Sequence, residues 1–285
     1  MNAPKLMQAD TAARGAELLP MMIAAADSAA AYIIQRTADR GTLEWRAKAH
    51  QDFVSDVDTG AERVVRESLL AGAPDAGILG EELSPNARAD AEMLFVVDPL
   101  DGTTNFLHGF PHYAVSIALV LNGTPAAGVV RNVVSGESFT AVLQQGARLN
   151  GARISVSTIH DPALSLVGTG IPFRTLDQLP VYLRQLDAIA RATSGVRRAG
   201  SAALDLCDVA CGRFEGFWEL YLSPWDFAAG ALIIREAGGI ATTVDGEPLP
   251  LSSSSVLAGT PAIHAWIGDL FRKNGGTTTS FSDAT

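Results

Sequence analysis

An apolar run that ends in two aspartates constrains this chain more than any other feature of its sequence. Residues 93–97 read Met-Leu-Phe-Val-Val and predict a buried strand. Asp98 follows directly, and Pro99 cannot donate a ladder hydrogen bond, so we expect the strand to stop there. Asp101 then lies in a turn in which Gly102 lets the backbone approach a ligand closely.

Two carboxylates that converge on one turn suggest a bound cation. They repel each other unless a positive charge lies between them. A divalent cation would supply that charge, and all-oxygen ligands favour magnesium, manganese or calcium over zinc. The competing interpretation is a solvated turn in which Asp98 and Asp101 accept hydrogen bonds from backbone amides.

Composition disfavours several classes of function. The chain has 285 residues, 47% hydrophobic and 18% charged, which is enough for a substantial core in one large or two coupled domains. Its formal net charge of −10 disfavours binding of a nucleic acid polymer, although bound cations would still attract a small anionic substrate. We find no convincing signal peptide and no apolar run as long as a membrane span, so we expect a cytoplasmic protein that does not bind membranes. Cys207 and Cys211 lie in a helical pattern and are expected to be core residues rather than a disulfide.

The first quarter of the chain predicts two helices. Residues 1–16 are expected to form a flexible arm, and apolar residues at helical spacing predict a helix over residues 17–39. A second helical pattern covers residues 61–69. Asp58 stands just before it, either as a helix cap or as a base that reaches toward the central turn.

Paired acids follow a short apolar strand before the central turn. Residues 78–80 predict the strand, and Glu81 and Glu82 come next. Adjacent glutamates usually meet water, but a carboxylate at a strand end can face a cleft. Glu81 is therefore a candidate third ligand.

After the central turn, the pattern becomes rich in strands. Residues 113–121, 126–133 and 138–143 predict an antiparallel meander, because Asn-Gly and Ser-Gly turn signals separate them. His108 and His112 flank Pro111 and are expected to be structural histidines rather than metal ligands.

The second half alternates short strands with helices. A strand is predicted over residues 214–218, and helices over residues 180–191, 202–211, 227–237 and 261–272. Gly200 and Ser201 precede one of these helices and Asp226 opens another, so each is either an ordinary cap or a ligand-binding group. The tail over residues 274–285 is rich in glycine, threonine and serine and is expected to be disordered.

Three separated blocks resemble those of the inositol monophosphatase family, within the magnesium-dependent, lithium-sensitive sugar-phosphate phosphatases. The blocks are Gly80-Glu81-Glu82, Asp98-Pro-Leu-Asp-Gly-Thr-Thr-Asn-Phe and Trp225-Asp226-Phe-Ala-Ala-Gly. Lys48, Asp52 and Asp58 also fall at family spacing, and the resemblance covers about residues 17–272. It implies a layered α/β/α/β/α fold with two sheets and flanking helices, and usually a homodimer. An N-terminal α+β lobe, residues 17–160, would carry most metal ligands, and a C-terminal α/β lobe, residues 161–273, would complete the site.

The resemblance also implies metal ligands. Glu81, Asp98 and the Leu100 carbonyl would hold a first magnesium ion. A second ion would be held by Asp98, Asp101 and Asp226. Glu81 would help to bind a weaker third ion, and manganese could replace magnesium.

Catalytic and substrate-binding roles follow from the same resemblance. Thr103, paired with Asp58, would orient and activate the attacking water, and the amides of Gly102 and Thr103 would hold the phosphate. The substrate's hydroxyl groups would meet Asp101, Gly200, Ser201, Ala202 and Glu219. Lys48 and Glu82 are accessory candidates.

The substrate itself stays open. A small phosphorylated polyol, inositol monophosphate, is the first choice because Glu219 lies seven residues before Asp226, as in inositol phosphatases. The alternatives are histidinol phosphate, the 3′-phosphate of an adenosine bisphosphate, or a regulatory protein that acts through a protein or RNA complex. An aspartyl-phosphate mechanism is disfavoured, since Asp98 and Asp101 do not form an Asp-x-Asp signature.

Overall fold

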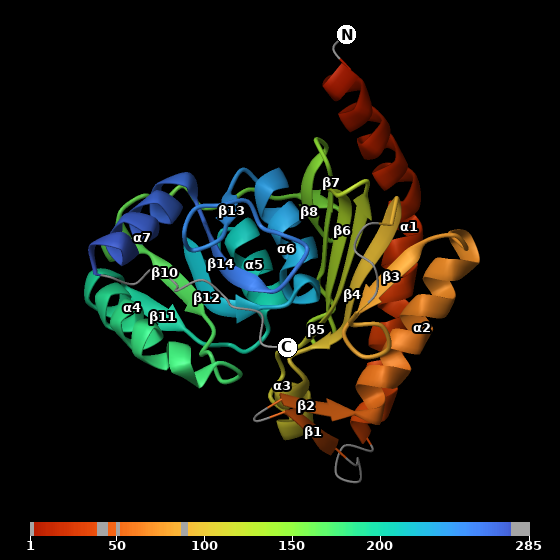
Figure 1. The fold of residues 1–285 in the computed structure, drawn as a ribbon, viewed down its shortest axis with the longest axis horizontal. Coiled ribbons are helices and arrows are strands. Elements are labelled where there is room, and N and C mark those ends of the chain that lie inside the picture. The colour runs from red at the N-terminus through yellow and green to blue at the C-terminus, as the bar shows by residue number, and fades with distance from the viewer. Residues whose placement is uncertain (1–2, 39–44, 50–51, 87–90, 275–285) are drawn as a thin grey trace.

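The computed structural model describes residues 3–38, 45–49, 52–86 and 91–274. Its helices and sheets alternate in the order α/β/α/β/α, which confirms the predicted layered fold (Figure 1). One outer layer contains α1 (Ala3–Arg36) and α2 (Asp56–Gly72), and the middle layer contains α5 (Ala202–Ala210) and α6 (Pro224–Glu236). The other outer layer contains α4 (Leu179–Ala192) and α7 (Pro261–Lys273).

The larger sheet has seven strands that neighbour one another in chain order. They are β3 (Gly77–Gly80), β4 (Met93–Asp101), β5 (Ala114–Leu121), β6 (Thr124–Asn132), β7 (Ser138–Val142), β8 (Gly146–Leu149) and β9 (Ala152–Arg153). Strand β3 is parallel to β4. Strands β5, β6 and β7 form the predicted antiparallel meander, which β4 extends on one side and β8 and β9 on the other. At the β5–β6 turn, Asn122 and Gly123 have φ angles of 48° and 75°, the left-handed conformation that tight hairpin turns require.

The smaller sheet has five strands in the order β11-β10-β12-β14-β13. They are β11 (Gly195–Arg197), β10 (Leu166–Thr169), β12 (Gly216–Leu222), β14 (Ser254–Gly259) and β13 (Ile240–Thr242). The remaining elements are the hairpin of β1 (Trp45–Ala49) with β2 (Asp52–Ser55), the short helix α3 (Thr103–His108), and the 3-10 turns η2 (Pro162–Leu164) and η3 (Leu176–Gln178).

Helix α1 begins at Ala3, so the flexible arm expected over residues 1–16 is largely helical. Ala12 is buried, and a Cβ atom on Gly15 would lie 2.5 Å from the carbonyl oxygen of Ala126 in β6. Small residues make this contact, and residues 8–16 contain no large apolar side chain from which an amphipathic helix could be recognised. The tail over residues 275–285 lies outside the described residues.

Helix α1 contradicts the expectation that no apolar run is as long as a membrane span. Its segment Gln8–Arg36 is long and apolar enough to cross a membrane by length and composition alone. Met22, Ala26 and Ile33 are buried in the core cluster shared with α2 and the larger sheet. This stripe is the pattern of a core helix.

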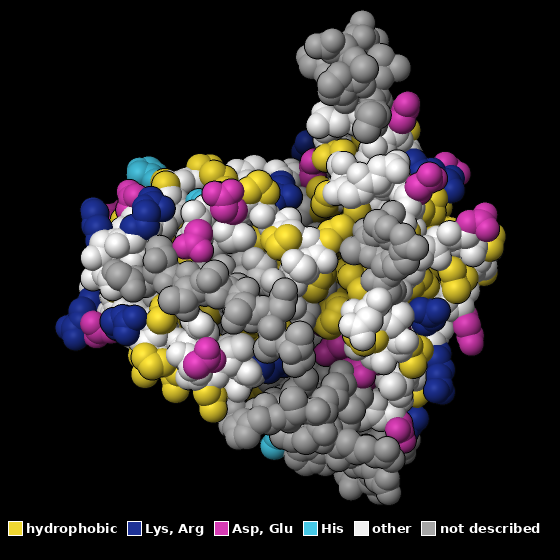
Figure 2. Space-filling view, viewed as in Figure 1, with side chains coloured by type: hydrophobic (Ala, Val, Ile, Leu, Met, Phe, Trp, Pro, Cys, Tyr) yellow, Lys and Arg dark blue, Asp and Glu magenta, His cyan; other side chains and the backbone are white. Residues whose placement is uncertain are grey.

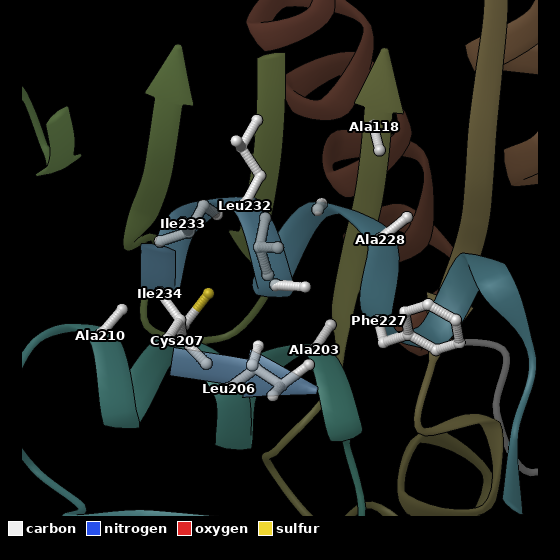
Figure 3. Close-up of a cluster of buried hydrophobic side chains, with 14 of the residues drawn as sticks. Ala118, Ala203, Leu206, Cys207, Ala210, Phe227, Ala228, Leu232, Ile233 and Ile234 are labelled. Atoms are coloured by element: carbon white, nitrogen blue, oxygen red, sulfur yellow. The ribbon is translucent and has the colours of Figure 1, made fainter. Parts of the chain in front are cut away.

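Both faces of the larger sheet are buried. Along β4, Leu94 and Val96 belong to the core cluster on the α6 side, whereas Phe95 and Val97 belong to the cluster on the α1 and α2 side. Figure 3 shows the middle layer, where the side chains of α5 and α6 interdigitate. Close approach of these helices requires Gly230, because a Cβ atom there would lie 2.7 Å from the Cβ atom of Leu206. Cys207 is buried in this layer and both cysteines are free, as predicted.

Candidate active site

An irregularity in β4 brings together Asp98 and Asp101, the two aspartates of the central block (residues 98–106). Contrary to expectation, the strand does not stop at Pro99 but continues to Asp101. Asp98 pairs with Ser116 and Asp101 pairs with Ala114, so β4 has one extra residue at this point. Residues three apart in a regular strand face opposite sides of the sheet, and the extra residue cancels that difference. Pro99, which has no amide hydrogen, is accommodated in the same bulge.

A third carboxylate comes from the start of α6. Asp226 completes a capping box, in which its Oδ2 atom accepts the Ser223 amide at 2.7 Å. Asp98, Asp101 and Asp226 are all buried, and each offers an oxygen within 4.8 Å of the others. Asp226 was expected to be either a helix cap or a ligand-binding group. Its geometry allows both roles, because one oxygen caps the helix and the carboxylate also belongs to the acidic group.

The electrostatics of this group fit a bound cation. Burial raises the pKa of Asp98 well above its ordinary value, and the charges of Glu81, Asp101 and Asp226 raise it further. The pKa of Asp226 is raised to about 7, mainly by burial and despite the opposing charge of Arg174. Carboxylates in such surroundings are stable as anions only beside compensating positive charge. The all-oxygen donor set suits magnesium or manganese.

Strand pairing places Glu81 beside these aspartates. Gly80 of β3 is the register partner of Val97 in the parallel strand β4, and the Glu81 amide donates to the Val97 carbonyl at 3.2 Å. Glu81 and Asp98 are thus adjacent at one edge of the sheet. The Arg174 guanidinium approaches the Glu81 carboxylate to 3.8 Å. Glu82 is outside the cavity lining described below.

The predicted pair of Thr103 and Asp58 is present. The Thr103 hydroxyl donates to Asp58 Oδ1 at 2.6 Å, with the Leu100 carbonyl as a second acceptor at 3.1 Å. The other oxygen of Asp58 accepts from the amide and hydroxyl of Ser55, at 2.8 and 2.6 Å. The helix begins at Asp56 with Ser55 as its N-cap, so Asp58 does not precede the helix as predicted but lies in its first turn and completes the capping box. It does so while also contacting Thr103.

A cavity of about 370 Å³ opens above the carboxylates and brings most predicted residues together. Its lining includes the predicted residues Glu81, Asp98, Leu100, Asp101, Gly102, Thr103, Gly200, Ser201, Ala202, Glu219 and Asp226. Asp58 adjoins it through Thr103. Lys48 lies in β1, where side chains are outside the described part of the structure.

The start of α5 forms one wall of this cavity. Ser201 caps the helix, and its hydroxyl donates to Asp101 Oδ2 at 2.5 Å. The Ala203 amide donates to the same oxygen at 2.8 Å. Ser201 therefore orients Asp101 in addition to facing the cavity, which the sequence pattern did not indicate.

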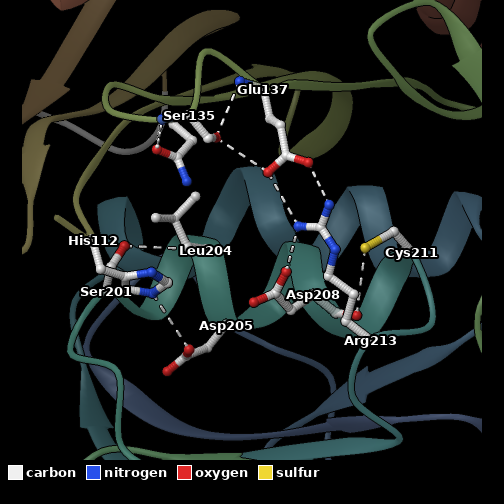
Figure 4. A network of polar contacts seen from close by, with 10 residues as sticks. His112, Ser135, Glu137, Ser201, Leu204, Asp205, Asp208, Cys211 and Arg213 are labelled. Atoms are coloured by element: carbon white, nitrogen blue, oxygen red, sulfur yellow. Dashed lines mark hydrogen bonds and ion pairs between the residues drawn. The ribbon is translucent and has the colours of Figure 1, made fainter.

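Ion pairs also connect α5 to neighbouring segments of the chain (Figure 4). His112 forms an ion pair with the buried Asp205 at 3.8 Å, and Arg213 contacts both Asp208 and Glu137. Burial lowers the pKa of His112, but its contacts with Asp205 outweigh that effect and raise it overall. Neither histidine belongs to the cavity lining. His112 is half-buried and contacts Asp205, which fits the structural role predicted for it, whereas His108 is exposed and does not fit that prediction.

Glu219 of β12 also lines the cavity. A Cβ atom on Gly170 would lie 2.0 Å from the Glu219 carboxyl carbon, so the carboxylate rests directly on that glycine. Burial raises the pKa of Glu219 well above its ordinary value, and the nearby charge of Asp226 contributes in the same direction. Two arginines at the rim, Arg174 and Arg198, were not among the predicted residues; Arg198 stacks over Phe173 at 5.3 Å.

Comparison with known proteins finds relatives that cover most of this chain. A model of the inositol monophosphatase family matches residues 15–275. An inositol-1-monophosphatase of Rhizobium meliloti is 41% identical over 242 residues, which cover 85% of this chain and 91% of that protein. The Nus factor SuhB of Pseudomonas aeruginosa is 41% identical over 246 residues, with 85% and 91% covered. The crystal structure of the extragenic suppressor protein suhB from Bartonella henselae has a TM-score of 0.86 at 38% identity, and the match covers 90% of this chain and 99% of that one.

These matches place the chain in the class of phosphatases. Within that class, the chain belongs to the inositol monophosphatase family.

Proposed function

We propose that the protein is a magnesium-dependent phosphomonoesterase that hydrolyses inositol monophosphate by direct attack of water. The observation that carries this proposal is the convergence of Asp98, Asp101 and Asp226 in the cavity that also contains Thr103. Such a group of buried oxygens suits a divalent cation, and the adjoining hydroxyl–carboxylate pair suits the activation of water.

The metal ligands are those of the central block and its neighbours. Glu81, Asp98 and the Leu100 carbonyl would hold one magnesium ion, and Asp98, Asp101 and Asp226 another. Ions bound there would neutralise charge on the phosphoryl group and lower the pKa of a water molecule.

Thr103 and Asp58 would then orient the attacking water and accept its proton. Because the Thr103 hydroxyl directs its hydrogen to Asp58 Oδ1, its oxygen presents a lone pair to a donor in the cavity. As water attacks, its proton passes to Thr103 Oγ1 while the threonine proton moves to Asp58 Oδ1. The two hydrogen bonds from Ser55 keep the carboxylate of Asp58 in place during this exchange.

Backbone geometry supplies the phosphate site. Gly102 has a φ angle of 97° and precedes α3, whose first amides have no acceptor within the helix. Gly102 and Thr103 both line the cavity, so their amides are the donors available to phosphate oxygens. The alcohol part of the substrate would meet Glu219 and the first turn of α5, including Gly200 and Ala202.

A phosphate-release assay tests this function. With magnesium, the protein should hydrolyse inositol 1-phosphate faster than histidinol phosphate or adenosine 3′,5′-bisphosphate, and a chelator should abolish release. In Glu219→Ala, the ranking of the three substrates should change while the magnesium requirement stays the same, because Glu219 contacts only the alcohol part. The exposed control Glu247→Ala should match wild type. Release from none of these compounds, or equal release with a chelator present, would contradict the proposal.

A second function, as a Nus factor, is favoured by the name of the Pseudomonas aeruginosa relative. Acidic and basic side chains are interspersed over the described surface visible in Figure 2, which suits a protein partner better than a nucleic acid polymer. The test is complementation of a Pseudomonas aeruginosa strain that lacks its own SuhB. Wild type and a catalytically inactive Asp98→Asn variant should both restore growth; failure of both variants, at normal protein levels, would exclude this role.

A further inference from the structure

Helix α2 carries a stripe of polar residues that connects two parts of the active site. Asp58, Glu62 and Arg66 are spaced four apart and therefore lie on one face of the helix. Asp58 holds Thr103, as described above. Glu62 and Arg66 contact a different segment, the turn over residues 80–84 that carries Glu81.

Glu62 binds the backbone of this turn. Its side chain is fully buried, at 0% exposure. One carboxylate oxygen accepts the Glu82 amide at 2.7 Å, and the Leu83 amide lies 3.2 Å from each oxygen. Charged acceptors make stronger hydrogen bonds with amides than neutral ones do, so the carboxylate fixes the backbone directly after Glu81.

The residue before Glu81 is shaped around the same carboxylate. A Cβ atom on Gly80 would lie 2.2 Å from Glu62 Oε1 and 2.6 Å from Glu62 Cδ. All three of the nearest atoms at that position belong to Glu62. The Glu62 carboxylate therefore reaches the turn only because Gly80 has no side chain.

Arg66 and Ser84 form further hydrogen bonds at the end of this turn. Arg66 Nη1 donates to Ser84 Oγ at 3.2 Å, and that hydroxyl donates to the Ile78 carbonyl at 2.8 Å. Glu81 lies between the two backbone positions that Glu62 constrains. Its side chain lines the cavity beside Asp98, and its charge is among the causes of the raised pKa of Asp98.

Burying a carboxylate costs free energy that its hydrogen bonds offset. An apolar residue in place of Glu62 would avoid that cost but would leave the Glu82 and Leu83 amides without their acceptor. What the carboxylate adds is a fixed backbone on both sides of Glu81.

We propose that Glu62 is a positioning residue that sets the magnesium affinity of the site by fixing Glu81. This inference rests on the proposed function, in which Glu81 is a metal ligand. Groups that hold a metal ligand in place typically change metal affinity by about 10- to 100-fold when they are removed. We expect a loss of that size in Glu62→Ala and a smaller one in Glu62→Gln, which keeps one acceptor oxygen.

The test measures magnesium binding without substrate, by isothermal titration calorimetry. The matched control is Glu67→Gln, an exposed glutamate on the same helix, which should bind magnesium as wild type does. Hydrogen exchange should be faster at the amides of residues 82 and 83 in Glu62→Ala. Turnover should recover at saturating magnesium, which a general loss of structure would not allow.

A double-mutant cycle separates positioning from simple destabilisation. In wild type, Gly80→Ala should displace the Glu62 carboxylate and weaken magnesium binding by about the same factor as Glu62→Ala. In the Glu62→Ala background the added methyl group has room, so Gly80→Ala should change the affinity less than about twofold. Equal effects of Gly80→Ala in both backgrounds would overturn the proposal, and so would an unchanged magnesium affinity in folded Glu62→Ala.

The two proposals fail in different ways. If wild type binds magnesium but releases no phosphate from the three substrates, the proposed function fails while the affinity comparison still tests Glu62. If wild type releases phosphate and the affinities of wild type and Glu62→Ala are equal, only the positioning role fails. If wild type binds no magnesium, both are wrong.

Discussion

Replacing Asp98 by asparagine is expected to abolish essentially all phosphate release. Asp98 belongs to the buried acidic group, and it is the one carboxylate assigned to both proposed magnesium positions. Removal of a single group that stabilises a transition state commonly costs about 10²–10³-fold in kcat. Removing a carboxylate that contacts two ions should reduce kcat by a larger factor. The measurement is kcat over a magnesium series, with the exposed Asp75→Asn as the matched control.

Loss of folding would not explain this result, because metal-free Asp98→Asn should be at least as stable as wild type. Burial and the charges of Glu81, Asp101 and Asp226 raise the pKa of Asp98, which means that its charged form destabilises the metal-free fold near neutral pH. Magnesium should raise the melting temperature of wild type and leave that of the variant nearly unchanged. Full turnover by Asp98→Asn at ordinary magnesium would show that the site is assigned wrongly.

The elements of the fold could be predicted where the signals are local. The meander follows from apolar runs and turn dipeptides, and α4, α6 and α7 begin within a few residues of their predicted starts. The first 16 residues were misassigned, since the start of α1 contacts β6 through small residues such as Gly15. Contacts of that kind leave no periodic pattern in the sequence.

In the site, too, the local motifs could be predicted from the sequence, whereas the contacts between distant segments could not. The block from Asp98 to Thr103 indicated a metal site, but its geometry depends on a one-residue bulge against β5 that the sequence does not reveal. Glu62 did carry a signal, since it lies one helical turn after Asp58. Its partner, the turn after β3, is about 20 residues away, and only the fold shows that they meet. Arg174 and Arg198 lie outside the helices and carried no signal of this kind.

Removing the Thr103 hydroxyl should lower kcat by about 10²–10⁴-fold, which corresponds to roughly 3–5 kcal/mol of transition-state stabilisation, with little change in KM. The hydroxyl is 2.6 Å from Asp58 Oδ1, so Thr103→Ala and Asp58→Asn should have similar effects on the attacking water. Thr103→Ser keeps the hydroxyl and should retain most activity. Steady-state kinetics at saturating magnesium give both parameters for each variant.

The double variant tests whether Thr103 and Asp58 act as one unit. If they share one proton path, the double change should cost about as much as the more severe single change, because groups in one relay are strongly non-additive. Asp58 also caps α2 through Ser55, so Asp58→Asn should lower stability by about 1 kcal/mol, whereas Thr103→Ala should not affect that cap. Melting curves therefore separate the cap from the relay. Losses of kcat that multiply in the double variant would mean that the two residues act on the reaction independently.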